Sequence, residues 1–295
     1  MQEYIVEVKN IRIDTYLAKI LNISRSKITK MLENNILVNN KKVKSSYLVK
    51  LNDKIEVQPY VEEDLSYEPE DMQLNIIYED DDVVVVNKDN GVVVHPAIGN
   101  TKHTLVNGLI YHFKTLSKSS FRPGIVHRID AYTTGLLMVA KNDFTHEALS
   151  KQLSEKKVHR IYQALVWGVI ENDTGTIDAP IGRDTNDRKK MAVTPINSKK
   201  AVTHFKVLKR FKNATFIELK LETGRTHQIR VHMNYIGHPV VNDPVYGKRK
   251  LIDETGQCLH AKELGFIHPR TGKYLEFDSE LPICFTNILK KFEEE

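Results

Sequence analysis

The chain has 295 residues, of which 41% are hydrophobic, and its formal net charge is +5. This length and apolar content are enough for one large domain with a buried core and a second, smaller domain, and they argue against disorder over most of the chain. No apolar run approaches the roughly 18 residues that a membrane helix requires, and the first residues lack the features of a signal peptide, so we expect a cytoplasmic protein outside the membrane. The two cysteines, Cys258 and Cys284, fit neither a disulfide framework nor a zinc site, and we expect two reduced thiols.

The charges fall into three blocks along the sequence. Residues 1–60 carry 11 Lys and Arg against 6 Asp and Glu, residues 61–82 carry 10 acidic and no basic residues, and the remainder carries 32 basic and 22 acidic residues. Two basic bodies joined by an acidic segment favour a polyanion as partner, since Lys and Arg gain from counterion release at phosphates. An ordinary solvated surface explains the total of +5 well and the segregation less well.

Residues 11–58 predict a small α/β domain. Apolar residues recur at helical spacing over 13–21, and a second helix is expected to follow its N-cap, Ser24. The segments 36–43 and 51–57 predict a hairpin and a closing strand. This pattern resembles the S4 RNA-binding domain, and the matching positions are Leu17, Ser24, Arg25, Ser26, Val38, Asn39, Val43, Asp53 and Ile55.

The resemblance to the S4 domain implies that the small domain binds RNA. The apolar pattern of the second helix leaves Arg25, Lys27 and Lys30 pointing outward, and we expect these three side chains to contact RNA. A generic small α/β module without an RNA partner is the alternative.

Residues 61–75 have the composition of a linker, with several acidic side chains and Pro69. We therefore divide the chain into an S4 domain, an acidic linker and a larger domain, over 1–60, 61–75 and 76–295. In the larger domain the first elements predicted are three strands and a helix, over 76–78, 83–86, 91–94 and 104–113.

The stretch His127-Arg128-Ile129-Asp130 lies in a polar loop before an apolar run, 135–141, that predicts a buried strand. A loop held by a rigid scaffold is a common place for catalytic groups, and a nearby Arg can keep a carboxylate ionised in a partly dry pocket. From these residues alone, an Asp that hydrogen-bonds to its own turn is the commoner explanation.

The string H-R-I-D at 127–130, followed by T-G-L-L-x-V-A-K at 134–141, resembles the central motif of the Rlu family of ribosomal large-subunit pseudouridine synthases. The strings N-K-D-N-G at 87–91 and H-P at 95–96 resemble a second motif of that family, with Asp89 in place of a Pro.

Three site residues are implied by the central motif. Asp130 would be the essential catalytic residue, Arg128 would help to hold RNA with its target base flipped out, and His127 would be a further RNA contact.

A helix is predicted over 143–156, and a β-rich run follows over 158–168. Alternation along this run places Tyr162 on the same side as Arg160. Tyr162 matches the Rlu tyrosine whose ring packs against the target base, and the resemblance implies the same role here. As an isolated residue, Tyr162 is more simply explained as a core aromatic.

Residues 180–193 predict a polar, basic loop of the kind that reaches a phosphate backbone. Its ends, P-I-G-R and M-x-V, resemble a further Rlu pattern, and we expect Arg183 to contact RNA. A merely solvated loop explains any single residue of this segment nearly as well.

A strand is predicted over 216–222, and Thr226 is expected to cap a helix with an apolar stripe of Ile229, Met233 and Ile236. The run G-R-T-H-Q-I-R-V-H at 224–232 resembles another Rlu motif. That likeness implies that Arg230 pairs with Asp130 and that Arg225 contacts RNA.

Three histidines, His227, His232 and His238, suggest a metal, but no carboxylate or Cys spacing completes a recognised site. Residues 270–274 lack the spacing of a phosphate loop and predict a hairpin turn between strands.

Together the motifs cover residues 11–58 and 76–285 in the order of the Rlu family. The fold implied is α+β: a pseudouridine synthase fold, with a large mixed, mainly antiparallel sheet and flanking helices, preceded by a small S4 domain. The activity implied is isomerisation of specific uridines to pseudouridine in RNA, above all in 23S ribosomal RNA, by a monomer that uses a catalytic aspartate and neither metal nor cofactor.

Two other functions remain open from the sequence. One is a non-catalytic RNA-binding or ribosome-assembly protein in which Asp130 is structural. The second is a carboxylate-based hydrolase acting on a nucleoside or sugar, although no second carboxylate has an obvious catalytic setting.

Overall fold

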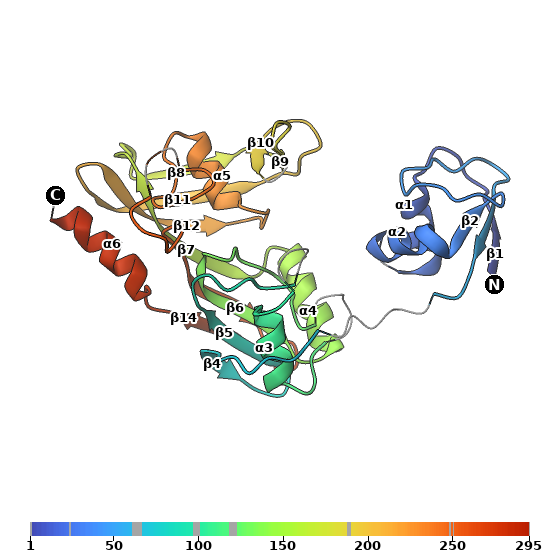
Figure 1. Ribbon diagram of the computed structural model, residues 1–295, viewed down its shortest axis with the longest axis horizontal. Coiled ribbons are helices and arrows are strands. Elements are labelled where there is room, and N and C mark those ends of the chain that lie inside the picture. Colours follow the sequence, from blue (N-terminus) through green and yellow to red (C-terminus); the bar gives the residue numbers. More distant parts are fainter. Residues whose placement is uncertain are drawn as a thin grey trace. The chain divides into compact units, whose positions relative to one another are not determined.

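A computed structural model of the chain describes residues 2–294 except 24, 61–66, 97–100, 118–122, 188–189, 248 and 250. The chain folds into two compact units, Met1–Leu65 and Ser66–Glu295 (Figure 1). Within the described residues, no helix is both long and apolar enough to cross a membrane.

The first unit packs two helices, α1 (Ile13–Leu21) and α2 (Arg25–Asn34), with a three-stranded antiparallel sheet. The sheet order is β1-β3-β2, and its strands are β1 (Gln2–Ile5), β2 (Ile36–Val38) and β3 (Lys54–Val57). Apolar side chains from both helices and from the sheet form one buried core, among them Leu17, Ile28, Ile36 and Ile55. In the turn after β2, Asn39 and Asn40 take positive φ angles of 49° and 61°, which Asn tolerates better than most residues.

The first unit differs from the sequence expectation at two strands. The hairpin predicted over 36–43 continues after its turn only as a single bridge between Val38 and Lys41. The sequence does not predict β1, whose side chains are mostly exposed and show no apolar alternation, yet β1 pairs with β3 along its whole length. Ser24, the expected N-cap of α2, lies outside the described residues.

The second unit is built on a nine-stranded mixed sheet. Eight strands follow the order β4-β5-β6-β13-β7-β12-β11-β8, and β14 pairs with β13. Among the strands of this sheet that the structure describes, only β6 and β13 run parallel. The bounds are β4 (Ile76–Glu79), β5 (Val83–Lys88), β6 (Thr134–Ala140), β7 (His159–Trp167), β8 (Thr174–Asp178), β11 (Val202–Arg210), β12 (Ala214–Leu221), β13 (Leu259–Ile267) and β14 (Tyr274–Asp278).

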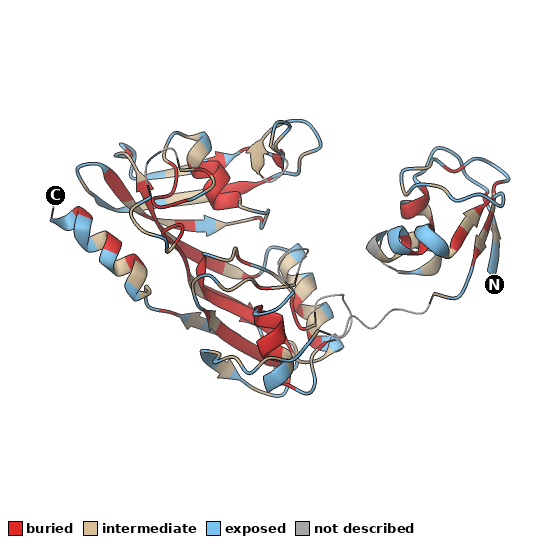
Figure 2. Cartoon of the chain, in the orientation of Figure 1, coloured by how far each residue is buried: buried red, intermediate tan, exposed pale blue. Residues whose placement is uncertain are grey.

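Helices cover both faces of this sheet. The helices α3 (Leu105–His112) and α5 (Gln228–Tyr235) pack into one core cluster, and α4 (Asp143–Ser154) and α6 (Ile283–Glu293) pack into two clusters on the opposite face. Strand β6 lies between the two layers and is buried at all 7 positions (Figure 2). Its alternate side chains enter opposite cores, as Leu137 and Leu136 illustrate. The expected α+β fold class is therefore confirmed.

The strand predicted over 91–94 does not form. Only Val93 makes a bridge, to Thr104. The carbonyl of Val93 accepts from the backbone N–H of Leu105, and that of Val94 accepts from Val106, at 2.8 and 3.1 Å. These carbonyls serve the N–H groups of the first turn of α3, which have no partner inside the helix, instead of a neighbouring strand.

Residues 180–193 form a two-stranded hairpin at their ends instead of a loop throughout. The strands β9 (Ile181–Arg183) and β10 (Met191–Val193) are antiparallel, with Met191 opposite Arg183. Arg188 and Lys189, part of the predicted basic loop, lie outside the described residues. The polar composition of this segment conceals the hairpin because the strands have only 3 residues each.

The cap expected for the 226–236 helix is also wrong. The N-cap of α5 is His227, with φ 55° and no side-chain cap bond, and not Thr226. The side chain of Gln228 holds the turn instead, since its Oε1 accepts from the N–H of Arg225 at 2.9 Å and from the hydroxyl of Thr223 at 2.8 Å.

Residues 67–75, which the composition assigns to the linker, lie along α3 of the second unit. Asn107 donates from its side-chain amide to the carbonyl of Glu68 at 2.8 Å, and the backbone N–H of Glu70 donates to the carbonyl of Asn107 at 3.1 Å. The acidic stretch that leads out of the first unit, 61–66, lies outside the described residues.

Candidate active site

Asp130 stands in the loop that leads into β6. The entry to this strand is fixed by Gly135, at φ +107°, because a Cβ there would collide with the backbone of Ala261 on β13. On the other side of the loop, the buried Nζ of Lys88 donates to three carbonyls, those of Asp89, Val92 and Ala131, at 2.8, 2.9 and 2.7 Å. The residue after Asp130 is thus tied to the end of β5.

The charge of the Lys88 ammonium group in this loop can change near neutral pH. Burial lowers the pKa of Lys88 to about 7, and the negative charges of Asp130 and Asp89 oppose that shift. When protonated, the ammonium has one N–H for each of its three carbonyl acceptors.

Arg230 connects two carboxylates that are far apart in the sequence. Its Nη1 lies 2.8 Å from Oδ2 of Asp130, and its Nε and Nη2 lie 2.7 and 2.8 Å from the two carboxylate oxygens of Asp243. The side chains of Arg230 and Asp243 are 5% and 0% exposed, whereas that of Asp130 is 17% exposed. Burial lowers the pKa of Arg230, but the hydrogen bonds and charges of the two carboxylates outweigh burial and raise that pKa above its ordinary value.

Two further side chains complete the surroundings of Arg230. The Tyr246 ring lies 5.1 Å from the Arg230 guanidinium carbon, and its hydroxyl is hydrogen-bonded to Nδ1 of His227 at 2.8 Å. The other ring nitrogen of His227 lies 3.8 Å from Oδ1 of Asp130. Burial lowers the pKa of His227, while the charge of Asp130 opposes the shift. The imidazole is thus placed beside the free oxygen of the carboxylate.

A pocket of about 120 Å³ opens beside Asp130. Tyr162, from the middle of β7, forms part of its wall and is 6% exposed. Burial raises the pKa of the Tyr162 phenol, so this hydroxyl stays protonated at neutral pH. Five residues singled out from the sequence line this pocket: Asp130, Arg230, Tyr162, Arg128 and Arg225. The carboxylate of Asp130 and the aromatic ring of Tyr162 therefore line the same small pocket.

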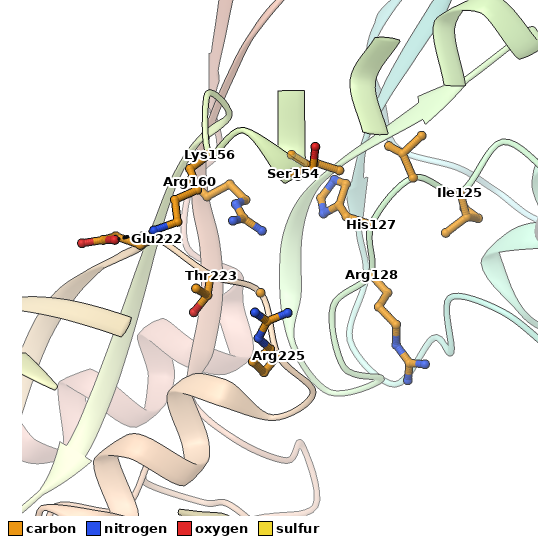
Figure 3. A pocket seen from close by; sticks show the side chains of 12 residues that line it. Ile125, His127, Arg128, Ser154, Lys156, Arg160, Glu222, Thr223 and Arg225 are labelled. Carbon is orange, nitrogen blue, oxygen red and sulfur yellow. Dashed lines mark hydrogen bonds and ion pairs between the residues drawn. The ribbon is translucent and has the colours of Figure 1, made fainter. Parts of the chain in front are cut away.

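A larger pocket of about 430 Å³ adjoins the first, and Arg128, Arg160, Gly224 and Arg225 line both. Its side chains are drawn in Figure 3. His127 lies here, and not in the pocket of Asp130. Burial lowers the pKa of His127 to about 3, with a smaller contribution from the charge of Arg160. The neutral ring accepts a hydrogen bond at Nε2 from the N–H of Met138 at 3.1 Å.

Four predicted RNA contacts are not among the residues that line these pockets. Arg183 ends β9, and the other three belong to the first unit. Arg25 pairs with the buried carboxylate of Asp14 at 2.7 Å, and Nζ of Lys27 lies 5.9 Å from the centre of the Tyr60 ring. Lys30 lies in the exposed part of α2.

The residues that sequence reasoning missed are Asp243, Tyr246, Lys88 and, as a member of the active site, His227. Lys88 and His227 lie inside the motifs at 87–91 and 224–232, but neither motif gives a role for them. Asp243 had a usable signal, since an acidic residue in an apolar stretch requires a cation, and Arg230 on an apolar helix face requires an anion.

The three histidines considered as metal ligands have separate partners. His232 is hydrogen-bonded to Thr203 and to the carbonyl of Ala179, both at 2.9 Å, and His238 to the carbonyl of Trp167 at 2.9 Å. Among the described residues, neither cluster with metal-binding geometry contains any of the three histidines.

Comparisons with known proteins identify the family of the chain. A sequence model of the RNA pseudouridylate synthase family matches residues 82–235, and one of the S4 domain matches residues 11–55. An uncharacterized RNA pseudouridine synthase of Bacillus subtilis, YlyB, is 54% identical over 96% of this chain and 95% of its own length. The ribosomal large subunit pseudouridine synthase D of Neisseria meningitidis serogroup B is 44% identical over 96% of this chain and 79% of its own.

Among solved structures, human RNA pseudouridylate synthase domain containing 1 has a TM-score of 0.60 and 27% identity, over 76% of this chain and 96% of its own. The matched segment 82–235 contains both Asp130 and Arg230, and it covers most of the large sheet. The chain therefore belongs to the RNA pseudouridine synthase family and isomerises uridine to pseudouridine in RNA.

Proposed function

We propose that this enzyme modifies specific uridines of 23S ribosomal RNA and that Asp130 is its catalytic residue. The observation that carries the proposal is the pairing of Asp130 with the buried Arg230 beside the Tyr162 pocket, at 2.8 Å. The relatives named ribosomal large subunit pseudouridine synthase D support the choice of RNA.

The reaction requires that the glycosidic bond breaks, that the base rotates and that it rejoins the ribose through carbon. A base in a helix cannot be reached, so the target uridine first leaves its stack. Asp130 then acts on the ribose, either as a nucleophile or as a base. Arg230 orients the carboxylate, and the fixed geometry removes the need to reorganise solvent during the reaction.

Tyr162 supports the uracil in this proposal. Its ring lines the pocket and offers a face on which the flipped base stacks. Arg128, which is exposed at the entrance of the same pocket, is suited to hold the RNA from which the base has left. The pathway assigns no step to a metal or cofactor, and we expect the protein to act as a cytoplasmic monomer.

The S4 unit is proposed to supply affinity. Its basic residues Arg25, Lys27 and Lys30 lie on α2, where they favour a phosphate backbone. The residues that line the Asp130 pocket all belong to the second unit, so the chemistry does not require the first.

The test is to incubate the protein with uridine-labelled 23S ribosomal RNA and to look for a mass-neutral, carbon-linked product. Asp130→Asn should abolish this product while the RNA dissociation constant stays within a few-fold, because the change removes the reacting charge and keeps the shape. Asp173→Asn, which neutralises a carboxylate that is 83% exposed, is the matched control. Substantial turnover by Asp130→Asn would remove Asp130 from the mechanism.

The same experiment separates the rival functions. A non-catalytic RNA-binding protein would yield no product with wild-type protein, and a hydrolase would release free base or sugar. Membership of the pseudouridine synthase family supports the isomerase.

A further inference from the structure

Arg160 is a buried cation that has no counter-ion in the part of the chain that the structure describes. It lies on β7, two residues before Tyr162, and is 8% exposed. Its Nε is fully buried and has no hydrogen-bond partner, and the guanidinium pairs with no carboxylate among the described residues. A buried charge is costly unless it is paired, so an unpaired Arg at this position implies that an anion completes it.

The surrounding backbone leaves space for this guanidinium. A Cβ on Gly224 would lie 2.9 Å from Nη1 of Arg160. Any side chain at position 224 would therefore press on the charged group. Gly224 does not have a positive φ angle, so the backbone conformation does not require a glycine there. Its lack of a side chain leaves space for the Arg160 guanidinium.

A second guanidinium points into the same space. Figure 3 shows the Arg160 and Arg225 head groups converging, with His127 across from them. Nε of Arg225 donates to the carbonyl of Lys200 at 2.9 Å, which orients the side chain and leaves its terminal nitrogens free of acceptors among the described residues.

The acidic side chain that lines this pocket does not neutralise the two arginines. Glu222 lines the pocket, but its carboxylate is engaged by Lys156 at 2.9 Å and by His204 at 2.8 Å. The neutral His127 adds no negative charge. Two convergent guanidinium groups therefore present several N–H donors and an uncompensated positive charge to a space of about 430 Å³.

A phosphodiester is the anion that fits both the chemistry and the place. The planar guanidinium donates pairs of N–H bonds in a geometry that matches phosphate oxygens. The larger pocket shares four lining residues with the pocket of Asp130. A phosphate bound in the larger pocket would therefore be close, along the RNA, to a nucleotide bound in the pocket of Asp130.

We propose that Arg160 and Arg225 form a binding site for the backbone phosphate adjoining the target uridine, which fixes the register of the RNA relative to Asp130. This inference rests on the proposed function, in which the Asp130 pocket receives the uridine. Arg160 is a binding residue in this scheme, and Arg225 is its partner. Phosphate contacts of this kind position a nucleic acid without reading its sequence.

The first test measures RNA binding in the Asp130→Asn background, so that no turnover disturbs the equilibrium. The probes are RNA fragments that contain the target uridine. Each fragment carries a neutral methylphosphonate at a different backbone linkage. With Arg160 present, neutralising one linkage next to the target uridine should weaken RNA binding by about tenfold. With Arg160→Gln, the same neutralisation should have little further effect, since a double-mutant cycle shows coupling only between groups in contact.

The matched control is Arg210→Gln. Arg210 loses the same charge, but its guanidinium is already partnered by Asp173 at 2.6 Å and by the carbonyls of Ile170 and Glu171. This variant should keep the full methylphosphonate effect. Arg160→Lys restores charge without the planar fork and should recover only part of the affinity.

A second measurement needs no RNA and shows whether Arg160→Gln folds. Because the Arg160 side chain has no partner among the described residues, the melting temperature of Arg160→Gln should equal or exceed that of the wild type. Inorganic phosphate, compared with chloride at equal ionic strength, should raise the melting temperature of the wild type and not that of Arg160→Gln.

The outcomes decide between distinct conclusions. Equal methylphosphonate effects in wild type and Arg160→Gln would overturn the proposal. If free phosphate stabilises the wild type but no linkage shows coupling, the site takes a free anion and not the RNA backbone, which also overturns it. Failure of Asp130→Asn to block turnover would instead remove the proposed function, because turnover and linkage coupling are measured separately.

Discussion

At the scale of single residues, the site depends on how Arg230 divides its hydrogen bonds. Two of its nitrogens bind the fully buried Asp243, and one binds Asp130. The arginine therefore keeps a counter-ion even when Asp130 loses its charge during a reaction. Asp243 positions the cation, which in the proposed mechanism leaves Asp130 available for chemistry.

We predict that Asp243→Asn destabilises the protein by about 3 kcal/mol, since it leaves a buried guanidinium without its main counter-ion. Single-turnover rates should fall as well, because Arg230 would no longer be held against Asp130. Denaturant unfolding and single-turnover assays measure the two effects. Asp173→Asn breaks an exposed ion pair and should change the free energy of unfolding by less than about 1 kcal/mol. Wild-type stability in Asp243→Asn would show that Arg230 does not need this partner.

Tyr162 offers a clean substitution at the same scale. Its hydroxyl forms no hydrogen bond with any residue that the structure describes, so Tyr162→Phe should alter the free energy of unfolding by less than about 1 kcal/mol and keep base stacking. If the hydroxyl transfers a proton in the reaction, the single-turnover rate should fall by about 100-fold. We expect that fall; a wild-type rate would reduce Tyr162 to a packing role.

At the scale of elements, the sequence predicts those strands and helices whose apolar residues follow one period. The fully buried β6, the alternating β7 and β12, and the helices α3, α4 and α5 are all expected from the pattern and present. Sequence motifs likewise indicated the loop of Asp130 and its partner Arg230, because the residues of each motif are contiguous in the sequence.

The elements that sequence reasoning missed lack that period. Strand β11 is half-buried or exposed over most of its length and carries polar residues there, and β8 has a single buried position, Ile177. Strand β8 is the edge strand and has one neighbour, β11, which lies second from that edge, between β8 and β12. The pairing of Arg230 with Asp243 was missed for a different reason, since no local pattern states which distant anion a buried cation will meet.

The parallel contact of β6 and β13 gives the structure a pH dependence. His260 on β13 is hydrogen-bonded to the hydroxyls of Thr134 and Ser279 at 2.8 and 2.9 Å, and burial lowers its pKa to about 4. Below its ordinary pKa of about 6.5, the unfolded chain therefore takes up a proton that the folded protein refuses until about pH 4.

We predict that stability falls as the pH is lowered from 6.5 to 4, with His260 contributing up to about 3 kcal/mol. His127 acts in the same direction, so the variant His260→Gln should show a shallower slope and not a flat one. Denaturant unfolding at pH 7, 6, 5 and 4 measures both slopes. Parallel slopes would place the pH dependence elsewhere.

At the scale of the whole molecule, the two compact units and the charge blocks suggest a division of labour. The first unit has its own core and carries an excess of basic residues, and every residue that lines the Asp130 pocket lies in the second. A tethered binding domain raises the effective concentration of its target without altering the chemical step.

We predict that deleting residues 1–60 weakens RNA binding by about 100-fold and flattens its salt dependence, since fewer counterions are released. At saturating RNA, the single-turnover rate should stay within about twofold of the full chain, because chemistry and affinity are separate in this scheme. Filter binding over a salt series and single-turnover assays test both parts. A truncated protein that folds and binds RNA normally but reacts far more slowly would show that the S4 unit contributes to the active site.

The pairing of β6 with β13 also has a consequence for how the enzyme is made. His260 lies opposite Thr134 in this register, and the carboxylates that hold Arg230 come from positions 130 and 243. Contacts between residues so distant in sequence give a high contact order. They slow folding because long loops must close, at a cost in entropy, before these stabilising contacts can form. A nascent chain therefore cannot form the centre of its large sheet, where β13 lies between β6 and β7, until β13 has been synthesised.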